Sequence, residues 1–554
     1  MPDLPADVSP DGFVRVAAPA DVAEGQMTQV DANGTPVLLA RVGGRLHACT
    51  AHCTHYGAPL ATGVLDGTRV VCPWHHAVFD VASGALCEPP ALDALKTFDV
   101  RESGGDVFVR VPAPAEIVGE GADYAETDGE TPEMAAPTDG RLFLVLGAGA
   151  AAQACAEALR EEGFTGRIAL AASEATPPYD RTKLSKGVAA GTAGDASLPL
   201  RDAAFYTRHG IDLWTGRTAE RLDPDTKTVR FADGETVVYD ACLVATGGTP
   251  NRLPVPGADL PGVFVLRSLA DAHALVAAAD GATRAVVVGA SFIGMETASS
   301  LTDRGIAVTV VDRADTPLAA ALGADVGGVF QTAAEAKGAS FRLGAGIERI
   351  EADDGGGLAV VLASGERLAG DLVVMGVGVR PATAFLDGAP FRRADGGLET
   401  DAALRLADSL FAAGDVAAFP DAGSGRRVRI EHWRLAMQHG RATARAMLGH
   451  DEPFAGVPFF WTSQFGIGLR YVGHAEKPNE TVIDGSLADR TFVAYYAEGD
   501  RIVAAAAIGR DRDAAAFHRL LARGLAPTAA EVRAGFDPVA ALRAAGDGTT
   551  GQGA

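Results

Sequence analysis

The sequence predicts a multidomain fold: an all-β domain, then an α/β region with two similar units, then a C-terminal α+β domain. Over residues 8–111, short β-type runs alternate with Gly and Pro turns, as in small all-β domains. Buried-strand patterns run into a glycine turn and a helix at Gly147 and again at Gly289. From residue 451 to about 545, β-type runs precede helical stretches, which indicates an α+β cap.

Composition limits the class of protein. The chain has 554 residues, enough for roughly three to four domains, and 47% are hydrophobic and 21% charged. A formal net charge of −23 argues against nucleic acid and anionic membrane surfaces as partners. The N-terminus lacks the features of a signal peptide, no apolar run is long enough to span a bilayer, and the six cysteines are not densely spaced. We therefore expect a cytoplasmic protein.

Two short pairs of metal-ligand residues lie in the all-β domain. Cys53-x-His55 and Cys72-x-x-His75 are separated by residues 56–71. Such a set can bind zinc, but zinc fingers group cysteine with cysteine and histidine with histidine. Here each pair mixes the two, as in a [2Fe–2S] centre where one iron takes two cysteines and the other two histidines. The stretch resembles a Rieske domain; a zinc site and metal-free surface residues are the alternatives.

Departures from the respiratory Rieske pattern bear on the redox potential. Ala58 and Trp74 stand where that type carries two bridging cysteines, and Ala77 and Phe79 where it carries hydroxyl donors to the cluster sulfurs. Fewer donors stabilise the reduced state less, so the resemblance implies a potential nearer about −150 mV than +300 mV. His76 occupies a position that is usually glycine.

The first α/β motif reads Gly147-Ala-Gly149-Ala-Ala-Ala152 and joins a buried strand to an Ala-rich helix. Glycines let the backbone approach a pyrophosphate, and the helix N-terminus favours its negative charge. The following strand ends at Glu174, whose carboxylate we expect to bond a ribose hydroxyl; an ordinary solvated loop residue is the alternative. The pattern predicts a dinucleotide site.

The second motif reads Gly289-Ala-Ser291-Phe-Ile-Gly294, and the next strand ends at Asp312, eighteen residues after Gly294 (312 − 294). That spacing is typical of the acid that bonds the ribose of a dinucleotide. An acid repels a 2′-phosphate, so we expect NADH in preference to NADPH, although the neighbouring Arg313 leaves NADPH open. Two dinucleotide folds in one chain indicate one site for FAD and one for NAD.

Further motifs make a resemblance specific. They are Pro178-Tyr-Asp-Arg181-Thr-Lys-Leu-Ser-Lys186, Ala245-Thr-Gly247-Gly-Thr-Pro-Asn-Arg, Gly376-Val-Gly-Val-Arg380-Pro, Leu410-Phe-Ala-Ala-Gly414-Asp415-Val, Glu431-His-Trp433 and Pro458-Phe-Phe-Trp461-Thr-Ser-Gln464-Phe-Gly. They resemble the FAD-dependent ferredoxin reductases. With the Rieske domain added, the whole chain is similar to the apoptosis-inducing-factor-like Rieske–flavoprotein fusions.

The resemblance implies a division into domains. Residues 8–111 form the Rieske domain, 141–257 and 383–450 the FAD-binding domain, 258–382 the NAD(P)-binding domain and 451–545 a reductase-type C-terminal domain. Residues 112–140 are rich in Pro, Gly, Ala and acids and contain no Lys or Arg, which predicts an acidic flexible linker.

The resemblance also implies roles for individual residues. Lys186 would lie near flavin N5, with Glu296 beside it at the nicotinamide, and Trp461 would lie where an electron acceptor docks. Asp415 would bond the ribityl chain, and Arg181 would touch the flavin phosphate or ring edge. A solvated lysine and a core tryptophan are the ordinary alternatives for Lys186 and Trp461. The other residues expected at the cofactors are Thr246, Gly247, Gly378, Gly414 and Trp433.

The expected activity is that of an NAD(P)H-dependent FAD oxidoreductase. Electrons would pass from NADH through FAD to the [2Fe–2S] cluster and on to a ferredoxin, an oxygenase or a small quinone. No Cys-x₄-Cys pair follows the first motif, so disulfide reduction is not expected. The alternatives are a flavin reductase whose Rieske domain serves only for docking, and a redox-sensing, apoptosis-inducing-factor-like signalling flavoprotein with little turnover.

Overall fold

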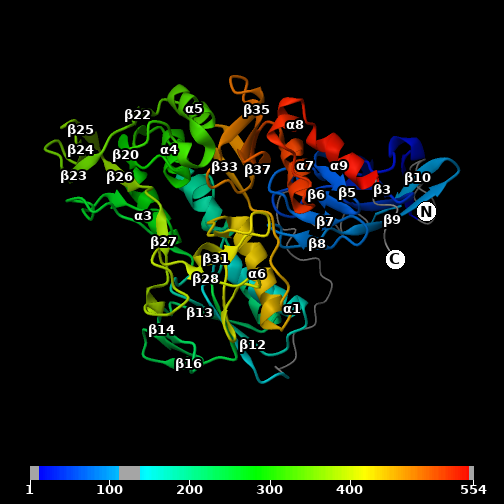
Figure 1. Cartoon of the computed structure of the whole chain (residues 1–554), viewed down its shortest axis with the longest axis horizontal. Coiled ribbons are helices and arrows are strands. Elements are labelled where there is room, and N and C mark those ends of the chain that lie inside the picture. The colour runs from blue at the N-terminus through cyan, green and yellow to red at the C-terminus, as the bar shows by residue number, and fades with distance from the viewer. Residues whose placement is uncertain (1–11, 112–137, 548–554) are drawn as a thin grey trace, which may run out of the picture.

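The computed structural model describes residues 12–111 and 138–547, and the Rieske-like domain and the second α/β unit lie at opposite ends of the molecule (Figure 1). Residues 112–137 of the expected linker, residues 8–11 of the expected first domain and the chain from 548 onward lie outside the described residues. No helix within the described ranges combines the length and apolarity needed to cross a bilayer.

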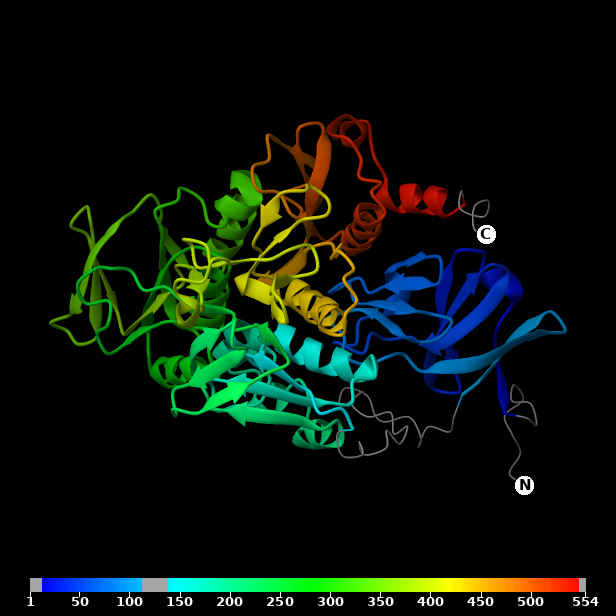
Figure 2. The same ribbon diagram turned by 60° about the horizontal axis from the view of Figure 1, so that its bottom comes forward.

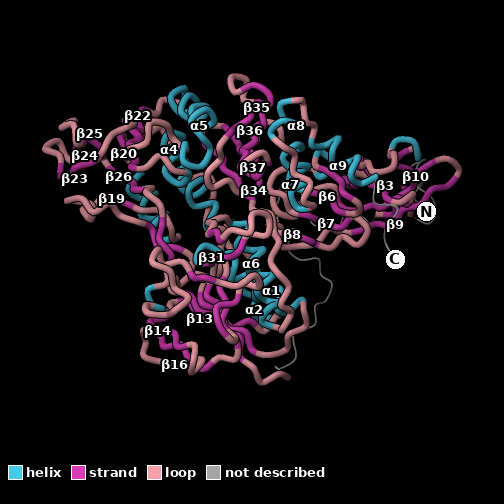
Figure 3. The backbone as a smooth tube through the Cα atoms, in the orientation of Figure 1, coloured by secondary structure: helices cyan, strands magenta, loops and turns pink. Residues whose placement is uncertain are grey.

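The N-terminal domain is built from two antiparallel sheets and is almost entirely strand and loop (Figure 3). Leu39 packs in a core on one face of the larger sheet, and Leu38 packs in a second core that also contains Cys53 and Cys72. The metal-ligand loops are therefore fixed to a rigid support. The larger sheet comprises β1 (Phe13–Ala17), β10 (Asp106–Arg110), β9 (Thr97–Ser103), β4 (Arg45–Thr50), β3 (Thr35–Val42) and β2 (Met27–Ala32); the smaller comprises β5 (Val64–Asp66), β6 (Arg69–Val71), β7 (Val78–Asp80) and β8 (Leu86–Glu88).

The first α/β unit takes its strands from two separate chain segments. Strand β11 (Leu142–Leu146) is buried at every position, which explains its unbroken apolar run. Helices α1 (Ala150–Glu161) and α6 (Trp433–Met447) pack against each other over this sheet, although they are far apart in sequence. The sheet comprises, in order, β13 (Ile211–Thr215), β12 (Arg167–Ala172), β11 (Leu142–Leu146), β17 (Ala241–Val244), β30 (Leu410–Ala412) and the antiparallel edge strand β29 (Arg405–Ala407), with α2 (Ala203–Arg208) before β13.

The second α/β unit is a parallel sheet inserted between those two segments. A short antiparallel pair, β18 (Gly248–Pro250) and β27 (Val379–Pro381), joins the two units. The sheet comprises β19 (Val263–Phe264), β26 (Leu372–Met375), β20 (Arg284–Val288), β21 (Ala307–Val311) and β22 (Ser340–Arg342), with helices α3 (Leu269–Ala279), α4 (Phe292–Asp303) and α5 (Ala319–Ala336). Three small sheets complete the α/β region: β14 (Ala219–Asp223), β15 (Thr228–Phe231) and β16 (Thr236–Val238); β23 (Ile347–Ala352), β24 (Leu358–Leu362) and β25 (Arg367–Gly370); β28 (Leu398–Glu399), β31 (Ala417–Pro420) and β32 (Arg427–Val428).

The C-terminal domain is an antiparallel sheet followed by helices that reach the Rieske-like domain (Figure 2). The sheet comprises β33 (Phe459–Gln464), β34 (Ile467–Gly473), β37 (Arg501–Ile508), β36 (Thr491–Glu498) and β35 (Glu480–Ser486), and the helices are α7 (Asp511–Ala522), α8 (Ala529–Arg533) and α9 (Pro538–Asp547). One apolar core unites the two domains and contains Val64, Val71, Val78, Ala515, Ala516, Leu520 and Leu542. The N-terminal domain is thus docked on the rest of its own chain.

Candidate functional site

Two loops with the same backbone pattern present the predicted metal ligands. In each loop the backbone N–H of the cysteine donates to the carbonyl of the residue five positions later, which is Ala58 for Cys53 and Ala77 for Cys72. The carbonyl of the cysteine accepts from the N–H of the residue four positions later, which is Gly57 for Cys53 and His76 for Cys72. The residue four after the cysteine has a positive φ in both loops, 73° at Gly57 and 56° at His76. His76 therefore adopts a left-handed conformation that costs a non-glycine residue about 1–2 kcal/mol.

The four predicted ligands meet as two pairs. The Nδ1 atoms of His55 and His75 lie 3.1 Å apart, and the thiols of Cys53 and Cys72 share a hydrogen bond. In the part of the chain that the structure describes, no three His, Cys, Asp or Glu side chains gather around one point that could hold a metal ion. A pair of thiols next to a pair of imidazoles fits two irons, each with two protein ligands of one kind.

Burial suits the two histidines to ligation, whereas it opposes the thiolate form of the two cysteines. It lowers the pKa of His55 to about 4 and the pKa of His75 well below its usual value, so both imidazoles are neutral at pH 7. The hydrogen bond with Cys72, together with burial, raises the pKa of Cys53. Burial acts to raise the pKa of Cys72, but hydrogen bonds from Cys53 and from the backbone lower it overall.

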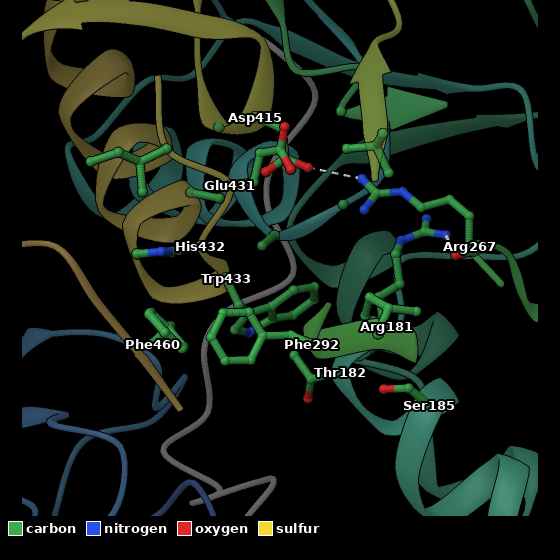
Figure 4. A pocket seen from close by; sticks show the side chains of 18 of the residues that line it. Arg181, Thr182, Ser185, Arg267, Phe292, Asp415, Glu431, His432, Trp433 and Phe460 are labelled. Atoms are coloured by element: carbon green, nitrogen blue, oxygen red, sulfur yellow. Dashed lines mark hydrogen bonds and ion pairs between the residues drawn. The ribbon is translucent and has the colours of Figure 1, made fainter. Parts of the chain in front are cut away.

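A cavity of about 560 Å³ opens where the parallel strands of both α/β sheets end, which is where such folds bind nucleotides (Figure 4). A Cβ added at Gly149, the N-cap of α1, would meet nothing within 4 Å, so the helix N-terminus is open to a ligand. The predicted residues that line the cavity are Gly149, Arg181, Lys186, Gly247, Ser291, Glu296, Gly378, Gly414, Asp415, Trp433 and Trp461.

Other predicted residues lie outside the cavity lining. Gly147 has a φ of 126°, and a Cβ on it would lie 2.2 Å from the Ala245 carbonyl oxygen, so the turn requires glycine. The Asp312 carboxylate accepts from the Ala290 N–H at 2.6 Å and so ties the end of β21 to the second glycine turn. The predicted residues outside the cavity lining are Gly147, Ala152, Glu174, Thr246, Gly289, Gly294 and Asp312.

Lys186 and Glu296 form an ion pair at the cavity wall. The lysine Nζ lies 2.8 Å from Oε2 of Glu296, which is only 4% exposed. Ser185 also donates to Oε2, and Thr462 donates to Oε1 at 2.7 Å. Lys186 belongs to a π-helical turn, Leu184–Val188, and such turns recur at functional sites. Three separate elements therefore hold one ammonium–carboxylate pair in place.

Two arginines fix the predicted ribityl-binding acid. Arg267 pairs with the Asp415 carboxylate at 2.9 Å (Figure 4), and Arg429 donates to the Asp415 carbonyl at 2.9 Å. Arg181 lines the same cavity and pairs with Glu174 at 2.6 Å. The acid expected at a ribose thus holds Arg181 at the cavity wall.

Trp461 lies between the cavity and the histidine pair. Its ring centroid is 4.4 Å from that of His75 and 6.1 Å from that of His55, and the same side chain lines the cavity. Tyr56 stacks on His55 at 3.9 Å and donates a hydrogen bond to Asp180 of the first α/β unit. The ligand histidines are therefore enclosed by aromatic rings at the junction of the two domains.

Sequence reasoning missed several residues of the site. His432, Arg267 and Phe460 line the cavity, and His432 Nδ1 is buried with no hydrogen-bond partner (Figure 4). Burial lowers the pKa of His432 to about 3, which leaves a neutral imidazole with an unused nitrogen in the wall. The only indication of His432 in the sequence is its position next to Trp433 in the Glu431-His-Trp433 motif. Together with the open helix N-terminus, this orphaned atom fits a cavity built to hold a flavin nucleotide.

Comparison with known families agrees with this geometry. Residues 12–99 match the Rieske [2Fe-2S] domain, 459–545 the reductase C-terminal domain and 142–440 the pyridine nucleotide-disulphide oxidoreductases. The chain belongs to the pyridine nucleotide-disulphide oxidoreductase family. This membership confirms the predicted multidomain fold, the Rieske–flavoprotein fusion and the cofactor set of FAD, NAD(P)H and a [2Fe–2S] cluster.

Individual relatives place the chain within that family. Apoptosis-inducing factor 3 from Mus musculus is 36% identical over 92% of this chain and 84% of its own length. Rhodocoxin reductase from Rhodococcus erythropolis is 35% identical over 69% of this chain and 89% of its own length. The solved covalent putidaredoxin reductase–putidaredoxin complex matches 74% of this chain and 99% of its own with a TM-score of 0.69 and 28% identity. The protein is an FAD-dependent NAD(P)H oxidoreductase similar to ferredoxin reductases.

Proposed function

We propose that this oxidoreductase passes electrons from NADH through FAD to its own Rieske cluster and then to a separate acceptor. The observation that carries the proposal is the position of Trp461, whose ring lies 4.4 Å from that of His75 while it also lines the cavity. One aromatic ring therefore separates a predicted cluster ligand from the cavity, and both belong to one polypeptide.

The chain's own residues prepare the cavity for this chemistry. When bound, FAD accepts two electrons together and releases them singly, as an iron–sulfur centre requires. The Lys186 ammonium would stabilise negative charge on a reduced ring, and Glu296 would keep that ammonium in position. Gly149 and the N-terminus of α1 would hold the pyrophosphate, and Asp415 the ribityl chain. Cys53, His55, Cys72 and His75 would hold the cluster.

NADH is the proposed donor in preference to NADPH, because Asp312 directly follows β21, the strand after the second glycine motif, and this is the position at which such folds carry the acid for the ribose of NAD. Asp312→Ala should raise the NADPH-to-NADH ratio of kcat/KM, since it removes the repulsion of a 2′-phosphate and leaves Arg313 beside it. Asp303→Ala removes an exposed acid at the end of the neighbouring helix α4 and serves as the control. An unchanged ratio in Asp312→Ala would contradict the assignment.

Anaerobic addition of NADH to the full-length protein with both cofactors tests the main proposal. We expect bleaching of the flavin absorbance followed by the electron paramagnetic resonance signal of a reduced Rieske cluster. Bleaching of the flavin without a cluster signal would refute internal electron transfer and would favour a flavin reductase in which the Rieske domain only docks.

The terminal acceptor is proposed to be a ferredoxin, an oxygenase or a small quinone. The similarity to rhodocoxin reductase and to a reductase solved in complex with putidaredoxin supports a protein acceptor. A screen of such acceptors with cluster-loaded protein identifies the class. The similarity to apoptosis-inducing factor 3 keeps a redox-sensing role as the second candidate, and slow turnover with every acceptor would favour it.

A further inference from the structure

Arg434 is the largest fully buried side chain in the described part of the chain. It lies in the first turn of α6, directly after Trp433, which lines the cavity. We propose that Arg434 is a positioning residue that holds the loop carrying Cys72 and His75 in one fixed orientation against the FAD-binding unit. This fixed orientation sets the rate of electron transfer from the cavity to the cluster. This inference rests on the proposed function, because it concerns the same electron path.

The guanidinium of Arg434 joins three parts of the molecule. Its Nε donates to the carbonyls of His76 at 3.2 Å and Pro89 at 2.8 Å, both in the Rieske domain. Nη1 donates to the Val457 carbonyl at 3.3 Å, just before the strand that carries Trp461. Nη2 pairs with the Glu88 carboxylate at 2.6 Å. Because a guanidinium presents its donors in a fixed fork, these acceptors are satisfied together in one relative position of the domains.

His76, the residue after the last ligand, is held from the other side as well. It has a φ of 56° and is fully buried, with its ring stacked on Phe459 at 4.0 Å and its Nδ1 2.9 Å from that of His518. A left-handed non-glycine residue persists where its surroundings over-determine it. Here those surroundings come from α6, β33 and α7, so the conformation of the ligand loop depends on docking.

Side chains of α6 and α7 make further contacts with Glu88. Gln438, one turn after Arg434, donates to it at 3.1 Å, and Arg519 of α7 lies 3.5 Å from its second oxygen. Arg519 also pairs with Asp66 at 2.8 Å. A charged group at a buried interface is tolerated when it is fully paired, and such pairing fixes how two surfaces meet. The Rieske domain is therefore anchored rather than free to swing.

The test compares two electron-transfer steps in Arg434→Met, with the holoprotein mixed anaerobically with NADH. Flavin reduction should keep its wild-type rate, whereas cluster reduction should slow severalfold or more, because electron transfer weakens steeply when the cluster loop moves away from the cavity. The matched control is Arg441→Met, which removes a 30%-exposed arginine of the same helix that pairs with Glu161. Arg434→Lys keeps the positive charge but loses the forked set of donors, so its rate of cluster reduction should lie between those of the wild type and Arg434→Met.

Two further measurements separate positioning from folding. Backbone amides at residues 76–78 should exchange hydrogen faster in Arg434→Met than in Arg441→Met, with or without cofactors. Should Arg434→Met fold poorly, the double variant Arg434→Met with Glu88→Gln also removes the negative charge that has lost its nearest cation, and it should show the same selective loss. Equal slowing of both steps, or wild-type cluster reduction in both variants, overturns the inference. A wild-type cluster that NADH does not reduce overturns the proposed function instead.

Discussion

At the scale of single residues, the cavity wall depends on the buried carboxylate of Glu296. It accepts from Lys186, Ser185 and Thr462. Glu296→Gln removes the charge partner of the lysine and weakens three hydrogen bonds. Because bonds to a charged group contribute about 1.5–3 kcal/mol, flavin reduction by NADH should slow by roughly ten- to a hundredfold. Glu335→Gln, at an exposed glutamate of α5, is the control for stopped-flow absorbance. An unchanged rate in Glu296→Gln would remove Glu296 from the proposed site.

His439 couples stability to pH. It is fully buried, its Nδ1 accepts from the Gly414 N–H at 3.3 Å, and burial lowers its pKa to about 3. In the unfolded chain a histidine takes up a proton below about pH 6.5, whereas folded His439 does not. The contribution of His439 to the free energy of unfolding is therefore fully present above about pH 6.5. It is lost at about 1.4 kcal/mol per pH unit as the pH falls from there to about pH 3.

The corresponding variant is His439→Asn, which cannot take up that proton when unfolded. The decline of the unfolding free energy between about pH 7 and pH 5 should become less steep by about one proton. Urea denaturation at several pH values measures it, with His273→Asn as the control at a half-exposed histidine. A slope as steep as that of the wild type would contradict the assignment.

At the scale of elements, the contact between α1 and α6 positions one wall of the cavity. A Cβ on Gly440 would lie 2.2 Å from the Ala151 carbonyl oxygen, so the two helices approach as closely as their backbones allow. Gly440→Ala should separate them, reduce stability by about 1–3 kcal/mol and weaken FAD binding, because Ala151 lines the cavity. Thermal unfolding and flavin titration measure both effects.

Gly328 in α5 provides the matched control for that substitution. Nothing lies within 4 Å of a Cβ added there, so Gly328→Ala should be neutral or should stabilise the helix by up to about 1 kcal/mol. Equal effects of the two substitutions would mean that the close approach of α1 and α6 does not matter.

At the scale of the whole molecule, the Rieske domain is docked through an apolar core and paired charges. The core joins β5 to α7 and α9, and Asp66, with an 11%-exposed side chain, pairs with Arg519 and Arg523. Salt screens buried pairs much less than exposed ones. The rate of cluster reduction by NADH should therefore be the same at about 0.05 M and about 0.5 M salt.

Reduction of ferricyanide, a charged external acceptor, serves as the control in the same salt series. Encounter between separate charged partners is strongly salt-dependent. If internal cluster reduction fell with salt as steeply as the external reaction, the two domains would have to meet by diffusion, and the docked arrangement would not be the working one.

The sequence by itself determined the order of the domains, the spacing of the two Cys–His pairs and the glycine turns, because each depends on local chemistry. Mixed Cys–His pairs specify two kinds of iron ligand, and Gly147 is required by the conformation of its own turn. Only the tertiary structure decided that Trp461 contacts His75 and that Arg434 bonds to the backbone of His76. Those residues are hundreds of positions apart, and contacts across such separations leave no periodic pattern in one chain; they arise when separate surfaces pack.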